Sequence, residues 1–589
     1  MVAGPTRSHA PTAPADTPDS APKPDRSNLA LTAIVAAYVL WGCAFIYRSS
    51  FVVDGVRYFC LLDDEMISMR YARNLVHAYG LVFNPGGERV EGFTCPLWVL
   101  YMALNHLLPV SAPKMSLLVQ LSGLALLAAN LIVIARLGEV VSNGSRRTGL
   151  AAAFLSAFYV ATNNWGLQGS EVAPLTLLIS AMARMAILCV QKKSSATPLY
   201  LLMGIATLVR MDAVVPTAVV LVILAIVDEP RRFQHVIVGG IVLVLFVGAQ
   251  TGFNFYYYGY PFPNTYYLKL TGFPLIPRIT RGAIATYRFL MEMNPLLPAL
   301  VTVLLLVRRD WRLTLLGLMV ATLIIYNVWI GADFTDSAGG SNRFVAVVMP
   351  LFFVLLACGL DGCASSFTRA FQNFDLVAKL GAGGVLAILT LLALISADLP
   401  VRNETLGFGF NDVTSLPCAS LMLLNPPYGI GMNEFDVAQA IRVGQMTDPD
   451  ARIMVGGAGV VPYFSDRFSI EVLGKTDRVI AHESWKRMKP GPSWQSFLPG
   501  HFKWDYAYSI GQMKPDLILD LATWDEASAQ PYLQDYYKLG AYYARTGSTH
   551  VHLAGAIARP GMGQRVEAAR AALQALTAKF HPKPSQSRP

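Results

Sequence analysis

The sequence contains few charged residues and lacks the cysteine patterns of metal sites. Charged side chains make up 14% of the 589 residues, whereas roughly a quarter is usual for soluble proteins. The seven cysteines include no CxxC pair and no Cys/His spacing of a zinc site, which argues against a structural metal. The net charge of +9 is spread in small clusters, without the continuous basic stripe that tracks nucleic acid. Neither an ordinary soluble protein nor a nucleic-acid-binding protein is therefore expected.

Long uncharged runs are abundant, because hydrophobic residues make up 54% of the chain. A run of about 18 or more such residues predicts a membrane span. We therefore expect an α-helical polytopic membrane protein with about eleven transmembrane helices, several of which extend past their apolar run. The runs cover residues 29–47, 115–137, 148–162, 172–190, 199–209, 214–227, 236–253, 296–306, 313–330, 344–360 and 376–395.

The positions of lysine and arginine predict how these helices are oriented. Residues 96–108 are apolar, but 13 residues span only about 20 Å as a helix, so we expect an interfacial helix. All basic turns then fall in alternate loops, which the positive-inside rule assigns to the cytoplasm. These turns contain Arg136, Arg146, Arg147, Lys192, Lys193, Arg231, Arg232, Arg308, Arg309, Arg312 and Arg369. We expect a multi-pass protein of the cytoplasmic (inner) membrane whose long loops face the extracytoplasmic (periplasmic) side.

Composition predicts four parts of the chain. Residues 1–28 are rich in Pro, Ala, Ser and Asp and cannot form a core, so we expect a disordered cytoplasmic tail. The transmembrane domain covers residues 29–397 and includes an external loop at 48–95. Residues 398–580 lose membrane hydropathy and contain strand-like runs, which predicts an extracytoplasmic α/β domain before a flexible tail at 581–589.

Two cysteines and two histidines raise further questions. Cys60 and Cys95 share the first external loop and either remain free or pair in an oxidising compartment. His550 and His552 alternate in a strand-like run, but the sequence places no third ligand beside them, so a metal site is not predicted. A glycine-rich loop at 456–459 departs from the GxGxxG spacing and is interpreted as a tight turn.

The densest group of acids follows the first apolar run. Asp63, Asp64 and Glu65 are consecutive at a predicted helix start, where the helix dipole favours carboxylates. One interpretation is a solvated, well-capped helix. The other is a carboxylate that acts as a base for an acceptor hydroxyl, or stabilises charge at an oxocarbenium-like sugar. Acids at a membrane boundary need a partner, which favours the second interpretation.

Candidate partners are expected on the same membrane face. Arg210 and Asp212 interrupt an apolar hairpin and either form an interhelical ion pair or contribute to a site. Glu171 opens the next span, and Asp333 and Asp336 precede Arg343. A guanidinium at a membrane surface suits a phosphate bidentately. We therefore predict Arg343, Arg210 and Lys269 as donor-phosphate-binding residues, and Glu65, Glu171, Asp212 and Asp333 as substrate-binding residues.

A tyrosine-rich segment at 255–269 is a further candidate. Tyrosines gather in interfacial belts for purely physical reasons, but the same rings can stack on sugars or isoprene units. Tyr257, Asn264 and Tyr267 are predicted to contact substrate. Pro261 and Pro263 favour a shaped loop over a continued helix.

Several motifs resemble one known family. They are Asp63-Asp64, Ser68-Met69-Arg70-Tyr71-Ala72-Arg73-Asn74-Leu75, Gly80-Leu81-Val82-Phe83-Asn84-Pro85-Gly86 and Val90-Glu91-Gly92-Phe93-Thr94, with the tyrosine-rich segment, Gly331-Ala332-Asp333-Phe334 and Arg343-Phe344. In this order they resemble actinobacterial arabinofuranosyltransferases of the GT-C superfamily, in particular those that add terminal β-1,2-linked arabinofuranose to arabinogalactan and lipoarabinomannan. The resemblance covers most of the chain from about residue 29 onward.

The resemblance implies a GT-C fold, an external active site and a catalytic aspartate in the first external loop. By position, Asp63 and Asp64 are the catalytic candidates, and the sequence does not rank them. The implied donor is decaprenyl-phosphate-arabinose and the implied acceptor is an arabinan polysaccharide. No cofactor is required by this implication, although a divalent cation at the donor phosphate remains an option. The alternatives are a polyprenyl-linked sugar transporter or flippase, and a non-catalytic flagellar-motor-associated membrane protein.

Overall fold

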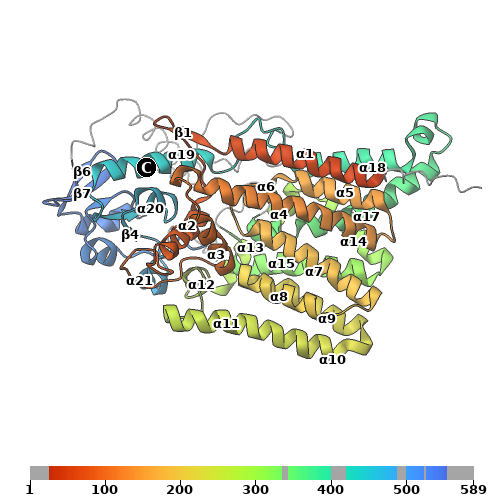
Figure 1. The fold of residues 1–589 in the computed structure, drawn as a ribbon, viewed down its shortest axis with the longest axis horizontal. Helices are drawn as coiled ribbons and strands as arrows, with labels where there is room; N and C mark the ends of the chain where they lie inside the picture. Colours follow the sequence, from red (N-terminus) through yellow and green to blue (C-terminus); the bar gives the residue numbers. More distant parts are fainter. Residues whose placement is uncertain (1–25, 334–341, 399–418, 487–498, 523–524, 553–589) are drawn as a thin grey trace, which may run out of the picture.

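The computed structural model describes residues 26–333, 342–398, 419–486, 499–522 and 525–552. A bundle of long helices forms one end of the molecule, and a domain that contains a β-sheet forms the other (Figure 1). The predicted C-terminal tail at 581–589, Asp336 and all but the last residues of the predicted N-terminal tail lie outside the described residues. The fold class expected from the sequence, a polytopic helical protein with a C-terminal α/β domain, is confirmed.

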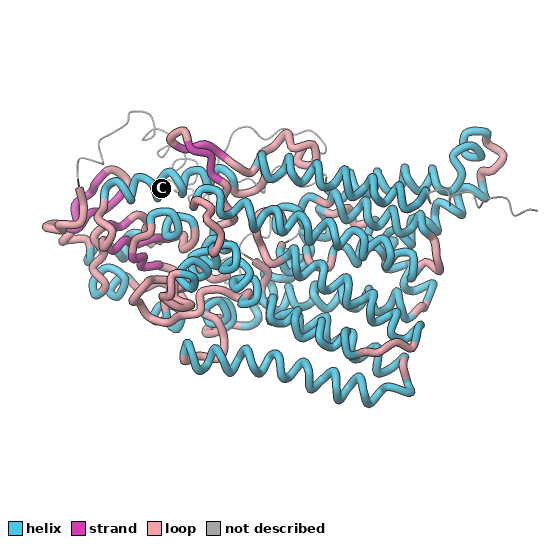
Figure 2. The backbone as a smooth tube through the Cα atoms, viewed as in Figure 1, coloured by secondary structure: helices cyan, strands magenta, loops and turns pink. Residues whose placement is uncertain are grey.

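The bundle accounts for all eleven apolar runs, since each falls on helical chain. Its helices are α1 (Arg26–Arg48), α4 (Ala112–Val141), α5 (Arg146–Phe158), α6 (Val160–Gly166), α7 (Val172–Lys192), α8 (Thr197–Val209), α9 (Val214–Val227), α10 (Arg232–Gln234), α11 (Gly240–Tyr258), α13 (Leu275–Glu292), α14 (Leu296–Arg308), α15 (Trp311–Ile330), α16 (Arg343–Ala346), α17 (Met349–Ala370) and α18 (Asp375–Asp398). Figure 2 shows how helix dominates this half of the molecule.

The predicted count of eleven spans is not confirmed. Among the described residues, seven helices are long and apolar enough to cross a membrane, or eight if the bent pair of α13 and α14 is one span. The difference lies in short helices: α5, α8 and α14 have 13 residues each and α9 has 14. At about 1.5 Å per residue such helices reach roughly 20 Å, less than the ~30 Å hydrocarbon core.

Small residues allow two of the bundle helices to pack closely. A Cβ at Gly138 of α4 would lie 2.9 Å from the Cα of Gly149 in α5, and one at Gly149 would lie 2.3 Å from the carbonyl oxygen of Ala135. The backbones can approach only because these side chains are absent, a common arrangement in membrane helix pairs.

Basic loops gather at the bundle end that is remote from the sheet domain. Arg147 pairs with Asp361 at 2.8 Å, and Arg312 donates to the carbonyl oxygen of Val140 at 2.9 Å. Helix α10 and the start of α1 lie at this same end (Figure 1). The basic turns therefore share one end of the bundle, as the sequence predicts, while the membrane face to which that end belongs remains a prediction.

The C-terminal domain is built on a five-stranded sheet in the order β4-β3-β5-β7-β6. Its strands are β3 (Arg452–Val455), β4 (Phe468–Glu471), β5 (Leu517–Ile518), β6 (Tyr536–Leu539) and β7 (Tyr542–Arg545), of which β4, β3 and β5 are parallel. The side chains of β3 alternate between the two faces of the sheet. Met454 packs on one face with Trp504 and Ile510. Ile453 and Val455 pack on the other face with Val443 of α19 (Ile430–Met446). Both faces of the sheet are covered, as in α/β folds.

The segment at residues 48–95, predicted as the first external loop, packs between the two halves of the molecule. It contains the hairpin of β1 (Phe51–Val53) and β2 (Val56–Tyr58) and the helix α2 (Asp63–Val76). Helix α3 (Pro96–His106) begins where the loop ends. Arg70 of α2 is buried and donates to the carbonyl oxygens of Phe83 at 2.7 Å and Arg467 at 2.8 Å, and also to that of Pro462. These bonds hold the C-terminal domain against α2.

One local expectation differs from the structure, and one open alternative is decided. Helix α11 continues through Tyr258 and ends at Gly259, whose φ of 80° terminates it, so the tyrosine-rich loop begins later than predicted and returns to helix in α12 (Asn264–Leu270). The apolar face of α11 extends the helix until a residue permits a left-handed cap. Cys60 and Cys95 are both buried free thiols, and the Sγ of Cys95 lies 3.6 Å from the Oγ of Ser68.

Candidate functional site

A chain of ion pairs joins the first external loop, the bundle and the C-terminal domain. Asp64, near the start of α2, lies between two cations: its Oδ2 is 3.0 Å from a guanidinium nitrogen of Arg343, and its Oδ1 contacts the Nζ of Lys475. Arg343 is contributed by the bundle and Lys475 by the C-terminal domain. The side chain of Asp64 is 35% exposed, so it remains accessible from solvent.

Arg343 extends the chain of ion pairs into the bundle. Its Nε lies 2.9 Å from the Oδ2 of Asp333, whose other oxygen lies 3.2 Å from the Nζ of Lys269. Arg343 opens the short helix α16, and the preceding Asn342 caps that helix by accepting from the backbone N–H of Phe344 at 3.1 Å. This cap fixes the start of α16 and therefore the position of Arg343, its first residue.

A second group of charges lies beside Arg343. Arg210 contacts the carboxylate of Glu171 and pairs with Asp212 at 2.7 Å. Its guanidinium is 4.5 Å from the ring centre of Phe344, close enough for a cation–π interaction. The predicted ion pair of Arg210 with Asp212 is therefore present, but it belongs to a larger group.

These side chains line a small pocket. Its charged wall consists of Glu171, Arg210, Asp212 and Arg343, and its other wall is apolar, formed by Leu175, Ile179, Pro216, Leu323 and Val347. The apolar residues come from α7, α9, α15 and the α16–α17 junction. A pocket with one charged and one apolar wall suits an amphipathic ligand.

Asp63 has different partners from its neighbour. Its Oδ1 accepts from the backbone N–H groups of Gly459 at 3.0 Å and Val460 at 2.9 Å, where α20 (Val460–Ser465) begins. A Cβ at Gly459 would lie 1.8 Å from the carbonyl oxygen of Asp63. The glycine-rich loop after β3 is therefore a docking turn for Asp63, and it requires glycine at this point of contact.

Glu65 is the third acid, and it is enclosed. It is buried, and neither carboxyl oxygen has a hydrogen-bond partner in another described residue. Burial, followed by the nearby charge of Glu171, raises the pKa of Glu65 to about 8. Glu65 therefore carries a proton at neutral pH and adds no negative charge to the group.

Neighbouring charges set the pKa values of Asp64 and Lys475, whereas burial sets that of Lys269. Burial works against the charged form of Asp64, yet Lys475 and Arg343 hold its pKa well below the usual range. Burial would lower the pKa of Lys475, but Asp64 and Asp63 raise it. Burial lowers the pKa of Lys269 although Asp333 is adjacent. Asp64 is thus an anion and Lys475 a cation at neutral pH.

Lys475 is a site residue that sequence reasoning missed, and His501 lies near enough for the charge of Lys475 to affect it. Burial, followed by the charge of Lys475, lowers the pKa of His501 to about 4, so this side chain is neutral in ordinary conditions. Lys475 lies in the loop between β4 and α21 (Arg478–His482), 411 residues from Asp64 along the chain. No local motif marks it, because a single lysine in a polar loop resembles any solvated residue.

The remaining predicted residues lie apart from the ion-pair chain, in supporting positions. Asn264 donates to the carbonyl oxygens of Gly474 and Asp477, both at 3.0 Å, and so holds the loop that carries Lys475. The hydroxyl of Tyr257 accepts from the backbone N–H of Leu81 at 3.1 Å in the first external loop. Tyr267 packs its ring 4.4 Å from His482.

The comparisons with known proteins bear on the fold. Residues 429–558 match a family described as "Domain of unknown function (DUF8728)", and no curated protein matches the sequence. The chain is similar to the archaeal oligosaccharyltransferase AglB from Archaeoglobus fulgidus in complex with an inhibitory peptide and a dolichol-phosphate, with 10% identity and a TM-score of 0.51 over 88% of this chain and 74% of that chain.

A second similar structure is ArnT from Cupriavidus metallidurans bound to undecaprenyl phosphate, with 9% identity and a TM-score of 0.44 over 76% of this chain and 85% of that chain. At these identities the likeness concerns the fold alone. The chain has the GT-C type of fold that it shares with the oligosaccharyltransferase.

Proposed function

We propose that this protein is a membrane glycosyltransferase that uses a sugar linked to a polyprenyl phosphate. More specifically, it transfers D-arabinofuranose from decaprenyl-phosphate-arabinose to the arabinan termini of cell-wall arabinogalactan and lipoarabinomannan. The observation that carries the proposal is the partly exposed carboxylate of Asp64 between Arg343 and Lys475. The shared fold agrees with a lipid-linked donor, because the AglB structure is a complex with dolichol-phosphate. The arabinose and the arabinan rest on the resemblance of the loop motifs.

The pocket next to Arg343 is lined by groups that could bind the headgroup of such a donor. Its charged wall can bind a phosphate and its apolar wall, with Leu175 and Ile179, can contact the first isoprene units. When the sugar is transferred, the phosphodiester becomes a phosphate monoester and gains negative charge, to about −1.5 to −2 at neutral pH. Cations beside it therefore stabilise the leaving group more strongly than the bound donor, which is the condition for catalysis.

The charges of the group are balanced before substrate arrives. Four basic side chains pair with four acidic ones, which are Arg210, Lys269, Arg343 and Lys475 against Asp64, Glu171, Asp212 and Asp333. An entering phosphate must therefore take a cation from a carboxylate. Asp64 is the most exposed of the paired acids around Arg343, so it is the carboxylate most easily displaced.

Displacement would turn Asp64 into a better base. While Lys475 and Arg343 hold it, the low pKa of Asp64 makes it a poor proton acceptor. Once these cations turn to the donor phosphate, its basicity rises, and the freed carboxylate can accept the proton of the attacking sugar hydroxyl. Donor binding would thus activate the base. Asp63 is less suited to this role, because two backbone N–H groups hold its Oδ1 in the docking turn. We therefore assign the catalytic role to Asp64 and a docking role to Asp63.

The proposal assigns no step to a metal ion at the donor phosphate. Asp64 and Asp333 are both engaged by cationic side chains. Within the described part of the chain, the group of His, Cys, Asp and Glu side chains close enough to share an ion lies elsewhere, in the C-terminal domain. In the proposal the four cationic side chains stabilise the leaving phosphate, and Asp64 accepts the proton.

Sidedness belongs to the same proposal. The ion-pair chain lies where the bundle meets the C-terminal domain, at the end remote from the basic loops (Figure 1). If those loops face the cytoplasm, the site and the C-terminal domain are on the extracytoplasmic side of the inner membrane, where the lipid-linked donor and the polysaccharide acceptor would meet.

A transfer assay tests the proposal. Purified protein in detergent is incubated with radiolabelled decaprenyl-phosphate-arabinose and a synthetic arabinan oligosaccharide. We expect the label in a glycan that is longer by one arabinose. If the label instead crosses the bilayer of proteoliposomes without entering glycan, the protein is a lipid-sugar flippase. If neither transfer nor translocation occurs, a non-catalytic role, such as in a flagellar motor, replaces the proposal.

A further inference from the structure

Two polar segments meet on the C-terminal domain, away from the ion-pair chain. Asp448 and Asp450 follow α19, and His550 and His552 follow β7. The backbone joins the segments: the N–H of Asp448 donates to the carbonyl oxygen of His550 at 3.0 Å, and the N–H of His552 donates to that of Met446 at 2.7 Å. This pairing holds the four side chains in position whether or not anything is bound to them.

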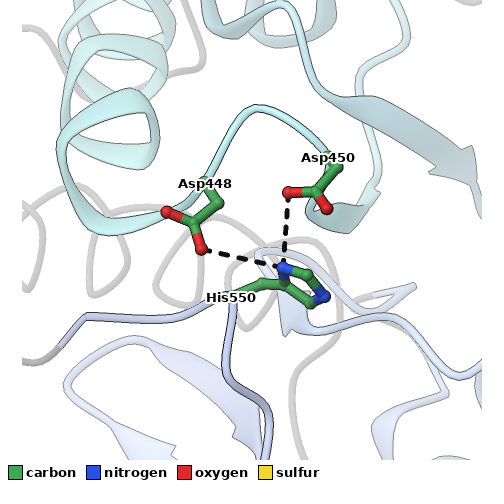
Figure 3. A group of neighbouring side chains, drawn as sticks. All are labelled: Asp448, Asp450 and His550. Atoms are coloured by element: carbon green, nitrogen blue, oxygen red, sulfur yellow. Dashed lines mark ion pairs between the residues drawn. The ribbon is translucent and has the colours of Figure 1, made fainter.

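The ligand atoms of three of these side chains gather at one point. Nδ1 of His550 lies 3.3 Å from Oδ1 of Asp450 and 3.7 Å from Oδ2 of Asp448 (Figure 3). All three ligand atoms lie within 4.8 Å of one another. Tetrahedral zinc has bonds of about 2.0–2.2 Å to imidazole and carboxylate, and such bonds place neighbouring ligand atoms about 3.4 Å apart. The two separations from Nδ1 of His550 are therefore close to those of a zinc site.

We propose that Asp448, Asp450 and His550 form a binding site for one divalent transition-metal ion, of which Zn²⁺ is the representative. The imidazole nitrogen favours this class over Mg²⁺ and Ca²⁺, which take oxygen ligands. Three protein ligands leave a fourth position for water.

His552 supports the site without being one of the three ligands. Its Nε2 lies 2.7 Å from Oδ1 of Asp448, the oxygen that faces away from His550. A hydrogen bond to the second oxygen of a ligating carboxylate orients that ligand, and such outer partners commonly change metal affinity by about 10- to 100-fold. The alternating histidines thus divide into one ligand and one orienting residue.

The site explains a pattern that sequence alone leaves unresolved. The histidines alternate in a strand-like run, but their carboxylate partners lie 100 to 104 residues earlier in the chain. A bound ion would tie the segment after β7 to the end of α19, which packs on the sheet through Val443 and Met446. Its role would be to stabilise the C-terminal domain, separately from sugar transfer.

Metal titration of the full-length protein tests this inference. Tag-free protein in detergent is first dialysed against a chelator, and Zn²⁺ alone is then added and measured by elemental analysis and equilibrium dialysis. We expect one Zn²⁺ per chain and a higher Tm in its presence. His550→Ala and Asp450→Asn should lose both effects, and His552→Ala should weaken binding by about 10- to 100-fold.

A matched variant controls for histidine loss. His77→Ala removes an exposed histidine at the end of α2 and should bind Zn²⁺ like the unaltered protein. The inference is overturned if the unaltered protein binds no Zn²⁺ after dialysis, or if His550→Ala and Asp450→Asn, shown to be folded by gel filtration, bind it equally well. Because transfer activity is not the readout, either result leaves the proposed enzymatic function to its own test.

Discussion

Three consecutive acids at the start of α2 have three different states, although the sequence presents them as one cluster. Asp63 accepts backbone N–H groups, Asp64 is held by two cations, and Glu65 is enclosed without a hydrogen-bond partner in another described residue. On a helix, successive residues point about 100° apart, so neighbours face different surroundings. Neighbouring positions on one helix therefore give a docking contact, a carboxylate between two cations and an enclosed acid.

Glu65 makes stability depend on pH. Its folded-state pKa is about 8, whereas an unfolded glutamate titrates near 4.3. Between these values the folded protein binds one proton more than the unfolded protein, so stability falls as pH rises from about 5 to 8. Glu65→Gln removes this dependence. We expect the Tm of the variant, relative to the unaltered protein, to increase steadily from pH 5 to pH 8.5 in detergent.

An exposed glutamate provides the control for that measurement. Glu434→Gln alters a surface residue of α19 and should show a constant Tm difference over the same pH range. A constant difference for Glu65→Gln as well would mean that Glu65 is ionised in the folded protein, contrary to its enclosed position.

At the scale of secondary-structure elements, the turn between β3 and α20 positions the first external loop. Its contact with Asp63 is one of backbone against backbone, since a Cβ on Gly459 would meet the carbonyl oxygen of Asp63. The sequence showed a glycine-rich turn without its purpose, because the partner lies 396 residues away along the chain. A local pattern can predict a turn but not the segment that docks on it.

Gly459→Ala tests this contact. The added methyl group forces α2 and α20 apart, and we expect transfer activity to fall at least tenfold, together with faster cleavage by added protease in the first external loop. Gly444→Ala is the matched change, because Gly444 lies in α19 with no atom within 4 Å of an added Cβ. It should preserve activity and protease resistance. Equal behaviour of the two variants would show that the close approach is unimportant.

Helix length marks another limit of prediction from sequence. Hydropathy placed all eleven apolar runs on helices, because a low fraction of charge is a strong signal. It did not distinguish a span from a shorter helix that packs inside the bundle, such as α5 with its 13 residues. Burial among other helices satisfies an apolar sequence as well as lipid does, so composition alone cannot set the count.

At the scale of the whole molecule, the motifs that carry the family resemblance mainly join the two halves. Arg70 donates to carbonyl groups from both the first external loop and the C-terminal domain. Asn84 both donates to and accepts from the backbone of Ser469, at 2.9 and 3.0 Å. Lys475 reaches Asp64 only because the C-terminal domain is held against the first external loop in this position. Such long-range contacts leave no periodic pattern, which is why the C-terminal contribution to the site could not be predicted.

Arg70→Met should loosen the two halves. The change removes the donors of several buried carbonyl groups, and each unsatisfied group costs about 1–3 kcal/mol. For three carbonyl groups this is about 3–9 kcal/mol, and we expect a Tm lower by several degrees, measured by thermal unfolding in detergent. Arg369→Ala alters an exposed arginine at the end of α17 and should leave the Tm unchanged. Equal Tm values for the two variants would contradict the proposed docking.

The central claim is that Asp64, between Arg343 and Lys475, is the reacting carboxylate and that Asp63 is not. The most direct measurement compares Asp64→Asn with Asp63→Asn in the transfer assay with decaprenyl-phosphate-arabinose. Asp64→Asn removes the base and should lower the rate by about 10²- to 10⁴-fold. Asp63→Asn keeps an oxygen that accepts from Gly459 and Val460, and should retain activity within about tenfold. Full activity of Asp64→Asn, or the reverse order of the two variants, would contradict the account.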